Sequence, residues 1–374
     1  MNINILWITN MPTIYRVHFF NELGKYCSLT VMFERYSATG VENKWDDSLA
    51  INFTPVFHRT ISVGREGAFG LGLLKVDYSL YDEVIISSYS SPAEMLALLK
   101  LKIIKRPYLL EVDGGVIKKD WYLKRMIKRF FIKGADLYFS SSDFTTKYLT
   151  FYGADREKVV KYHFSSLFDE DILKMPISTL KKNEIKEEFG FGNKNVVLAV
   201  GQFIYRKGFD ILINAASRLP KECIVVFVGG EPTNEYIELV KELNLSNIKF
   251  VSKQNKQTLK KYYALADVFV LPTREDIWGL VINEAMGMAL PVITTDMCVA
   301  GVELIVNERN GFIVEVNNEV ALAQRITQLL NDEDIRGKMS LSSLECIKSY
   351  SIENMAKEHY EVFTDRFRKR HLTD

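Results

Sequence analysis

The chain has 374 residues, of which 47% are apolar and 25% charged, and its net charge is +1, a composition typical of a globular soluble protein. This length predicts two domains, each able to bury its own core. No run of 18 or more apolar residues is present, the start MNINILWITN lacks a basic leader and a cleavage site, and the four cysteines have no paired or metal-type spacing. We therefore expect a cytoplasmic protein with reduced thiols and no transmembrane span.

Short apolar runs alternate with helical segments in the first half of the chain. Strands are expected at residues 3–8, 29–33, 83–87, 108–112 and 135–141, and a helix at 92–102. This alternation predicts a parallel, doubly wound sheet. The strand that begins at Tyr108 runs into Gly114 and Gly115, which allow either a close approach of the backbone to a ligand or a simple tight turn.

Residues 118–133, KKDWYLKRMIKRFFIK, combine seven basic side chains with one acid. At 3.6 residues per turn, the apolar side chains occupy one broad side of a helix and the cations the other. Aromatics and cations with almost no acids are typical of a helix that lies on anionic lipid. We therefore expect Lys118–Lys133 to contact an anionic membrane surface, on the inner face of the cell membrane, with a solvated surface helix as the alternative. Nucleic acid is not expected as a partner because no known binding module accompanies this segment.

The second half begins after a stretch, residues 165–195, that is rich in Lys, Glu and Asp and lacks strand character. We place the interdomain linker near residues 165–170. The strand Asn195–Val200 then leads through Gly201 into a loop that ends at Lys207, just before a helix. A lysine at the carboxyl end of a strand and next to a helix start is placed to neutralise a diphosphate.

The most informative segment is Thr273–Pro291, TREDIWGLVINEAMGMALP. A buried strand is expected to end near Leu271, and a helix follows at 279–289. In a parallel sheet, the loop after such a strand faces the ligand crevice, and the helix presents its free N–H groups to an anion there. Asp276 in the loop and Glu284 on the helix form a fixed pair of carboxylates, which suits vicinal hydroxyl groups.

This acid-x7-acid pattern around WGLVINEAM, closed by LPV, resembles the signature of family 4 retaining glycosyltransferases. The resemblance implies the α/β GT-B fold, with two Rossmann-like doubly wound parallel-sheet domains facing a cleft. Residues 1–167 would form the acceptor domain and 168–351 the donor domain. A helix at about 352–374 would pack back on the first domain.

The resemblance also implies the reaction. A hexosyl or N-acetylhexosaminyl group would pass from a UDP- or GDP-linked sugar to an acceptor hydroxyl with retained anomeric configuration, without a metal or another cofactor. Together with the basic helix, it suggests a lipid-linked glycan as acceptor, in the assembly of a capsule, O-antigen or exopolysaccharide.

Residues of the second domain receive donor-side roles from the resemblance. The family's donor loop has Gly-Arg, four intervening residues and Lys-Gly; Gly201 and Lys207 match, Gln202 replaces the arginine, and Arg206 is the candidate to supply the missing charge. Lys207 and the N–H groups of the helix start would stabilise the leaving diphosphate. The donor-binding set is Gly201, Gln202, Arg206, Lys207, Ser252, Glu275, Trp278, Gly279, Leu280, Val281 and Glu284.

Two carboxylates share the remaining donor contacts. Glu284 would hold the ribose diol, and either Asp276 or Glu275 would hold the hydroxyls of the donor sugar. The family usually has Glu where Asp276 stands, so the sequence leaves open which of these neighbours is the functional acid.

On the acceptor side, the loop after the first strand, from Asn10 to Arg16, would line the cleft, together with Gly114 and Gly115. Many relatives carry a His that faces the reacting sugar near this point. Here the nearest polar group is Asp113, which we take as its substitute and count with Lys207, Asp276 and Glu284 as a catalytic candidate.

Other functions remain to be compared with this resemblance. Glu111-Val-Asp113 has the form of the metal-binding motif of the other large glycosyltransferase fold, but nothing else in the chain supports it. A GT-B epimerase or phosphorylase, and a catalytically silent sugar-nucleotide-binding subunit of a membrane assembly, stay as alternatives. A dinucleotide oxidoreductase is disfavoured because neither domain's first strand leads into the three-glycine phosphate turn.

Overall fold

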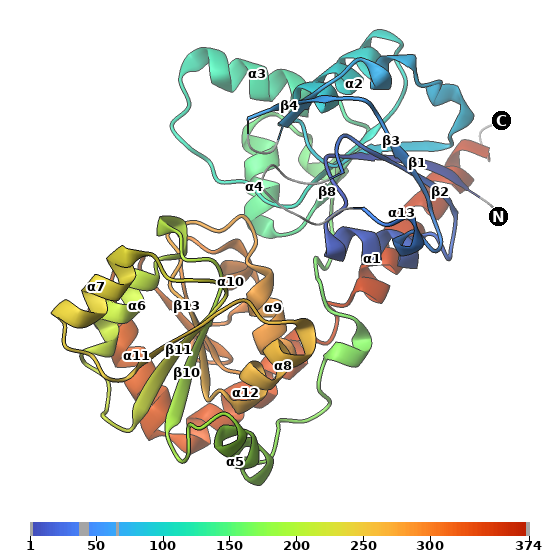
Figure 1. The fold of residues 1–374 in the computed structure, drawn as a ribbon. Coiled ribbons are helices and arrows are strands. Elements are labelled where there is room, and N and C mark those ends of the chain that lie inside the picture. The colour runs from blue at the N-terminus through green and yellow to red at the C-terminus, as the bar shows by residue number, and fades with distance from the viewer. Residues whose placement is uncertain (1–2, 37–44, 65–66, 372–374) are drawn as a thin grey trace. The chain divides into compact units, whose positions relative to one another are not determined.

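The computed structural model describes residues 3–36, 45–64 and 67–371 (Figure 1). The chain divides into unit 1, Met1–Ser165 with Ser351–Asp374, and unit 2, Ser166–Tyr350. The predicted boundary after residue 167 lies two residues beyond this division. Residues 372–374, which the prediction included in the last helix, lie outside the described residues.

Unit 1 is built on a seven-stranded parallel sheet with the order β3-β2-β1-β6-β7-β8-β9. Its strands are β1 (Asn4–Thr9), β2 (Ser28–Phe33), β3 (Thr54–Phe57), β6 (Glu83–Ile86), β7 (Leu109–Val112), β8 (Leu137–Ser140) and β9 (Val159–Lys161). An antiparallel pair, β4 (Ile61–Val63) and β5 (Gly67–Phe69), stands apart from the sheet. The helices are α1 (Ile14–Leu23), α2 (Pro92–Ile103), α3 (Tyr122–Ile132), α4 (Asp143–Phe151) and α13 (Ile352–His371).

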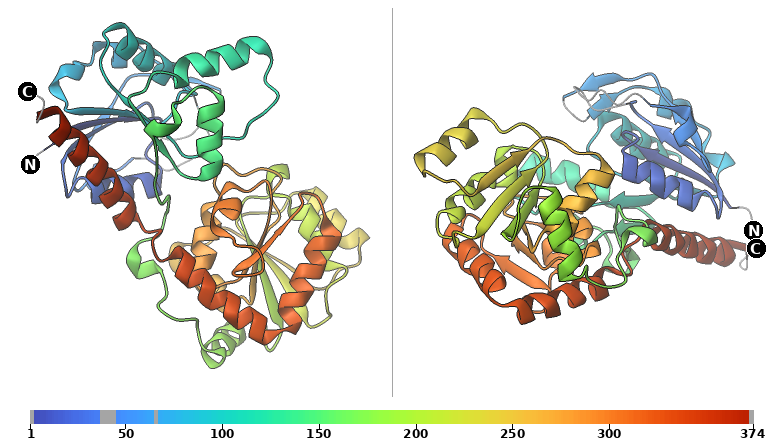
Figure 2. Two further views of the ribbon diagram at one scale, coloured as in Figure 1. Left: turned by 180° about the vertical axis from the view of Figure 1, so that it is seen from behind. Right: turned by 60° about the horizontal axis from the view of Figure 1, so that its bottom comes forward.

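The C-terminal helix α13 completes unit 1 and lies beside α1, as both views of Figure 2 show. His359 of α13 is fully buried, and its ring packs at a tilt on Phe139 and edge-to-face on Phe19, with ring centroids 4.2 and 5.1 Å apart. At the far end, Arg370 Nη2 lies 2.9 Å from Oε1 of the buried Glu83. An apolar seam and an ion pair therefore hold α13 on unit 1.

Unit 2 contains a six-stranded parallel sheet with the order β12-β11-β10-β13-β14-β15. Its strands are β10 (Asn195–Val200), β11 (Cys223–Val228), β12 (Ile248–Val251), β13 (Val268–Leu271), β14 (Val292–Thr295) and β15 (Gly311–Val314). Its helices are α5 (Thr179–Glu188), α6 (Phe209–Ala216), α7 (Asn234–Glu242), α8 (Lys256–Leu265), α9 (Leu280–Gly287), α10 (Val299–Leu304), α11 (Glu319–Asn331) and α12 (Glu333–Ile347). The prediction of two Rossmann-like, doubly wound parallel-sheet domains is confirmed.

The strand order places the ligand edge of unit 2. From β10 the chain adds β11 and β12 on one side, and it then crosses to add β13, β14 and β15 on the other side. The order therefore switches between β10 and β13, which are hydrogen-bonded neighbours. In open parallel sheets, ligands bind outside the carboxyl ends of the strands at such a switch point. The loops after Val200 and after Leu271 therefore form the edge where a site is expected. Among the described residues, no helix has the length and apolar character that a membrane span requires.

Candidate functional site

Two cations and one carboxylate meet at the switch point of unit 2. Lys207 Nζ lies 2.6 Å from Asp276 Oδ2, and Arg206 Nη1 lies 3.0 Å from Asp276 Oδ1. The side chains of Lys207 and Asp276 are 12% and 10% exposed, whereas that of Arg206 is 44% exposed. Lys207 follows β10 and Asp276 follows β13, so the pairing of these two strands brings the three side chains together.

The two loops that carry these residues are hydrogen-bonded to each other. Thr273 Oγ1 and the Arg274 backbone N–H both donate to the carbonyl oxygen of Arg206, each at 2.8 Å. Arg274 also donates to both carboxylate oxygens of Asp210, at 2.8 and 2.6 Å. Sequence reasoning did not identify Thr273 or Arg274 as site residues, because their partners lie 67 and 64 residues away in the chain.

Glycine is required at two points of this arrangement. Gly208 has φ +66°, and a Cβ there would stand 2.0 Å from the carbonyl oxygen of Pro272. Gly279, the N-cap of α9, has φ +102°, and its Cβ would stand 2.9 Å from Cys298 Sγ and 3.7 Å from Asp276 Oδ2. These close approaches place the start of α9, with its free N–H groups, beside Asp276.

Glu284 lies on α9 and is held by a residue from another helix. Tyr263 Oη donates to Glu284 Oε2 at 2.7 Å. Burial raises the pKa of the Glu284 carboxyl, while the Tyr263 hydrogen bond and the charge of Lys256 oppose the rise. Tyr263, which sequence reasoning also missed, is 2% exposed and comes from α8, so no local pattern pairs it with Glu284.

The other predicted donor residues have varied surroundings. Trp278 differs from its expected role, because its side chain is 4% exposed and its Nε1–H donates to Asn283 Oδ1 at 2.8 Å. The indole therefore lies in the interior, where the amide satisfies its only polar group. Gln202 and Ser252 are exposed, and Gly201, Glu275, Leu280 and Val281 are half-buried. Arg206 Nη1 also donates to the Glu275 carbonyl oxygen at 2.8 Å.

In unit 1, Arg16 lies in the interior, which differs from its predicted position on the acceptor side. Its side chain is 4% exposed, and Nη2 donates to both carboxylate oxygens of Asp113, at 2.6 and 2.7 Å. Nη1 donates to Oε1 of Glu111, which is fully buried, at 2.9 Å. Burial opposes the guanidinium charge, but Asp113 and Glu111 outweigh it and raise the pKa of Arg16. The fully buried charge of Glu111 requires a cation beside it, so Arg16 has a structural role in unit 1.

Asp113 itself keeps a 25% exposed side chain, and Tyr162 Oη donates to Oδ1 at 3.1 Å. Gly115 makes a close approach within the unit, because a Cβ there would lie 2.7 Å from the ring of Tyr148. Gly114 and Asn10 are half-buried, and the Asn10 carbonyl oxygen accepts from Arg35 N. Asn10 and Asp113 thus end β1 and β7 at the same edge of the sheet.

The basic segment 118–133 is helical only from Tyr122, so Lys118 and Lys119 precede α3. Ile132 is buried in the core of unit 1, but most of the other apolar side chains are not covered within the unit: Trp121, Tyr122 and Phe130 are 65%, 78% and 50% exposed. Lys128 differs from its neighbours: it is 18% exposed and pairs with Asp120 Oδ2 at 2.7 Å.

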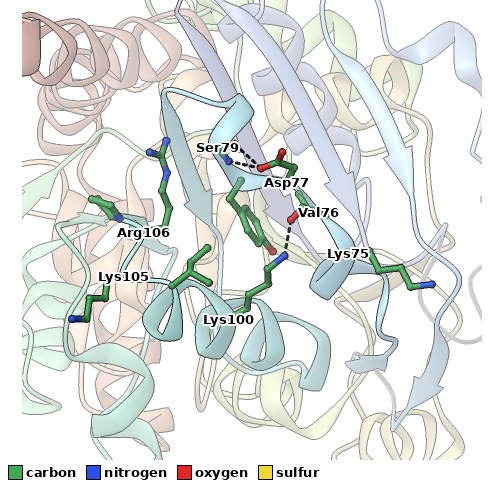
Figure 3. A pocket seen from close by; sticks show the side chains of 10 residues that line it. Lys75, Val76, Asp77, Ser79, Lys100, Lys105 and Arg106 are labelled. Atoms are coloured by element: carbon green, nitrogen blue, oxygen red, sulfur yellow. Dashed lines mark hydrogen bonds between the residues drawn. The ribbon is translucent and has the colours of Figure 1, made fainter.

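A pocket of about 590 Å³ in unit 1 lies away from all predicted site residues, at the amino ends of β6 and β7. Among its cations, Lys75 and Lys105 point away from each other (Figure 3). Lys100 Nζ donates to the carbonyl oxygens of Leu74 and Val76, at 2.8 and 2.7 Å. Lys100 is therefore bound to the backbone, and Lys75 and Lys105 are exposed to solvent. For this reason we do not take this pocket as the candidate site.

Known proteins resemble this chain, and the family match lies in unit 2. Residues 181–343 match the family Glycosyl transferases group 1. This segment contains the whole Lys207–Asp276 cluster and Glu284. An uncharacterized glycosyltransferase of Methanocaldococcus jannaschii is 27% identical over 290 residues, 76% of each chain. The capsular polysaccharide biosynthesis glycosyltransferase CapM of Staphylococcus aureus is 25% identical over 302 residues, 76% of this chain and 77% of CapM.

Among solved structures, Anabaena HepE in complex with UDP has a TM-score of 0.77 at 17% identity, over 98% of this chain and 100% of HepE. At this identity the likeness concerns the fold, and the predicted GT-B fold class is confirmed. The group 1 match thus covers the unit in which the switch-point cluster was found.

Proposed function

We propose that the protein is a retaining glycosyltransferase that moves a sugar from a nucleotide-sugar donor to a hydroxyl of a lipid-linked glycan in polysaccharide biosynthesis. The observation that carries the proposal is the contact of Lys207 and Arg206 with Asp276 beside the start of α9, inside the group 1 match. The relatives named as glycosyltransferases, among them CapM, support the same reaction class.

The chemistry follows from the charges at this edge. Loss of the nucleoside diphosphate builds negative charge on its β-phosphate. Lys207 has three N–H donors, of which Asp276 takes one, so two remain for phosphate oxygens. Arg206, whose side chain is 44% exposed, supplies a second cation in place of the arginine missing at Gln202, and the N–H groups of Gly279 and Leu280 add the positive end of α9.

The two carboxylates position the donor. Asp276 accepts hydrogen bonds from hydroxyls of the transferred sugar while it pairs with Lys207. Glu284 accepts hydrogen bonds from the ribose diol, while Tyr263 fixes the Glu284 side chain. The acceptor hydroxyl attacks from the face of the leaving group, which retains the anomeric configuration. Side-chain cations and the helix start provide the charge stabilisation in this mechanism, so we expect full activity after exhaustive chelation.

The acceptor proposal depends on α3. Its uncovered aromatic and aliphatic side chains lie among Lys124, Arg125 and Arg129, all exposed. Such a surface gains free energy when the apolar groups enter the headgroup layer and the cations meet anionic lipid. We propose that the protein works peripherally at the inner face of the cell membrane, where a lipid-linked acceptor resides.

Donor binding provides the direct test. A thermal-shift panel of UDP-, GDP- and ADP-sugars should give one donor that raises the melting temperature, because a ligand of the native state stabilises it. The Lys207→Ala variant should lose that shift, and Lys261→Ala, on the surface of the same unit, should keep it. A donor shift that is the same in all three proteins would contradict the site.

Product analysis separates the remaining alternatives. Slow release of free sugar from the donor by the purified chain is expected of a transferase without its acceptor. A GT-B epimerase would instead return an altered nucleotide sugar, a phosphorylase would require inorganic phosphate, and a silent binding subunit would leave the donor intact.

A further inference from the structure

Unit 2 contains a second polar cavity, at the opposite edge of its sheet from the Lys207–Asp276 cluster. The cavity measures about 260 Å³. Asn195, Asp267 and Leu290 contribute to its wall, and they lie at the amino ends of β10, β13 and β14. Strands of four to six residues separate it from the switch point by at least about 13 Å. It is therefore a separate site.

Three cations from two helices line this cavity: Lys182 and Lys186 from α5, and Arg336 from α12. Figure 1 shows α5 and α12 at the same end of unit 2. The carboxylates in the wall are Asp267, which is 4% exposed, and Glu333, which is exposed. The buried part of the cavity thus holds more positive than negative charge.

One carboxylate serves both lysines. Lys186 Nζ lies 2.7 Å from Asp267 Oδ2, which also accepts from the Val196 backbone N–H at 2.8 Å, and Lys182 Nζ lies 3.4 Å from Oδ1. Lys182 Nζ also donates to the Ala266 carbonyl oxygen at 2.7 Å, which carries no charge, so the single charge of Asp267 can neutralise only one of the two ammonium groups. Burial lowers the pKa of Lys182, and although the charge of Asp267 opposes this, the charges of Lys186 and Arg336 add to the lowering. An uncompensated charge of this kind is costly in a partly buried site.

Several hydrogen-bond donors in the wall remain for a ligand. Arg336 Nη1 donates to the carbonyl oxygens of Leu329 and Leu330, while its Nε and Nη2 groups have no acceptor among the residues that the structure describes. Three asparagines, Asn183, Asn193 and Asn195, also line the cavity, and within the described parts of the chain their side-chain amides bond to no other residue. Cations together with amide donors form the donor set that binds oxyanions.

We propose that this cavity binds a small oxyanion, either inorganic phosphate or the phosphate of a short phosphomonoester, held by Lys182, Lys186 and Arg336. The ligand offsets the charge that Asp267 leaves uncompensated. The volume of about 260 Å³ restricts the occupant to a small molecule, since pockets for drug-sized ligands begin at roughly 300 Å³. This assignment is independent of the donor site.

The test is a phosphate titration of the full chain followed by thermal shift, with chloride at matched ionic strength as reference. Wild type should show a saturable rise in melting temperature. Lys182→Gln should weaken phosphate binding by about 10- to 100-fold, as expected for loss of a charged hydrogen bond, and Lys182→Arg should retain it. Lys181→Gln is the matched control, because Lys181 lies on the same helix but pairs with Glu184 outside the cavity.

Two further variants complete the design. Lys207→Ala should keep the phosphate response, which distinguishes this cavity from the diphosphate site. Arg336→Gln, on α12 rather than α5, should weaken binding as Lys182→Gln does, and it replaces that variant if Lys182→Gln fails to fold. The absence of a saturable shift in wild type, or equal weakening in Lys181→Gln and Lys182→Gln, would overturn the proposal.

Glycerol 3-phosphate identifies the source of the anion. Tighter binding than inorganic phosphate, lost in Lys182→Gln, would support a phosphomonoester as the ligand. Binding of inorganic phosphate alone would support the free ion.

Discussion

Lys207 Nζ and Asp276 Oδ2 lie 2.6 Å apart, although 69 residues separate them in the chain. The pair joins the loop after β10 to the loop after β13, and it places the cation that we propose for phosphate next to the acid that we propose for sugar hydroxyls. Each member therefore positions the other, and the first two predictions depend on this contact.

Replacement of Lys207 by alanine should lower turnover by roughly 10²–10³-fold, because it removes one of the groups that we propose to stabilise the leaving diphosphate. The measurement is the steady-state rate of sugar transfer, with circular dichroism to verify folding. Lys261→Ala removes a surface ion pair with Glu188 in the same unit and should leave the rate unchanged. An unaltered rate in Lys207→Ala would remove this lysine from the site.

Asp276→Asn tests which of the two neighbouring acids is functional. The amide keeps the shape of the side chain but loses the charge that holds Lys207 and Arg206, so turnover should fall by about 10- to 100-fold. Glu275→Gln is the matched control, and it should retain the rate within about threefold. The reverse order of effects would assign the role to Glu275.

Tyr263→Phe should change the pH dependence of the reaction. The Tyr263 hydroxyl opposes the burial that raises the pKa of Glu284, so its loss should raise that pKa further. If Glu284 works as a carboxylate, the acidic limb of kcat/KM moves to higher pH. Tyr262→Phe, the adjacent residue without this bond, should leave the profile in place. Coincident profiles for wild type and Tyr263→Phe would exclude Glu284 ionisation as the cause of the acidic limb.

His359 should make unit 1 sensitive to acid. Burial lowers the pKa of His359 to about 4, below the 6.5 of an unfolded histidine. Protons then bind the unfolded chain preferentially, so stability is present above pH 6.5 and is lost as pH falls toward 4. The loss from this group amounts to about 2 kcal/mol between pH 7 and pH 5.

Urea unfolding of His359→Gln at both pH values measures this effect. The difference in unfolding free energy between pH 7 and pH 5 should shrink relative to wild type, whatever the absolute stability of the variant. His371→Gln, on the exposed end of the same helix, should behave as wild type. An unchanged difference in His359→Gln would contradict the proposed linkage.

Charge reversal on α3 tests membrane contact. The triple variant Lys124→Glu, Arg125→Glu and Arg129→Glu should bind anionic vesicles at least about 100-fold more weakly, at about 1 kcal/mol per cation. Lys128 is left intact because it holds Asp120. The same reversal at Lys181, Lys241 and Lys261 in unit 2 gives an equal net charge and should bind as wild type. Co-sedimentation with phosphatidylglycerol vesicles measures both, and equal binding would leave α3 as a solvated helix.

Local patterns predicted much of the fold correctly. The apolar runs at 195–200 and 267–271 became β10 and β13, and the helix expected at 279–289 is α9, Leu280–Gly287. These elements follow from short-range rules of side-chain alternation, helix propensity and the stop at Pro291. The same rules placed Lys207 and Asp276 in loops at the carboxyl ends of strands.

Long-range pairing was the part that the patterns did not reveal. Arg16 was assigned to the acceptor side and Asp113 to catalysis, yet the two bind each other across 97 residues, and the Arg16 side chain is 4% exposed. Trp278 was assigned to the donor, yet its indole lies in the interior. A charged or aromatic side chain in a loop looks the same in a sequence whether it meets solvent or a buried partner.

The amino-acid sequence alone determined the alternation of strands and helices, the two-domain division and the acid-x7-acid segment, because each depends on residues that are neighbours in the chain. Only the tertiary structure decided that Lys207 and Arg206 share Asp276, that Tyr263 holds Glu284, and that two lysines share Asp267. These contacts depend on which strands lie side by side, and the parallel order β11-β10-β13-β14 is fixed by packing of the whole unit rather than by any single stretch.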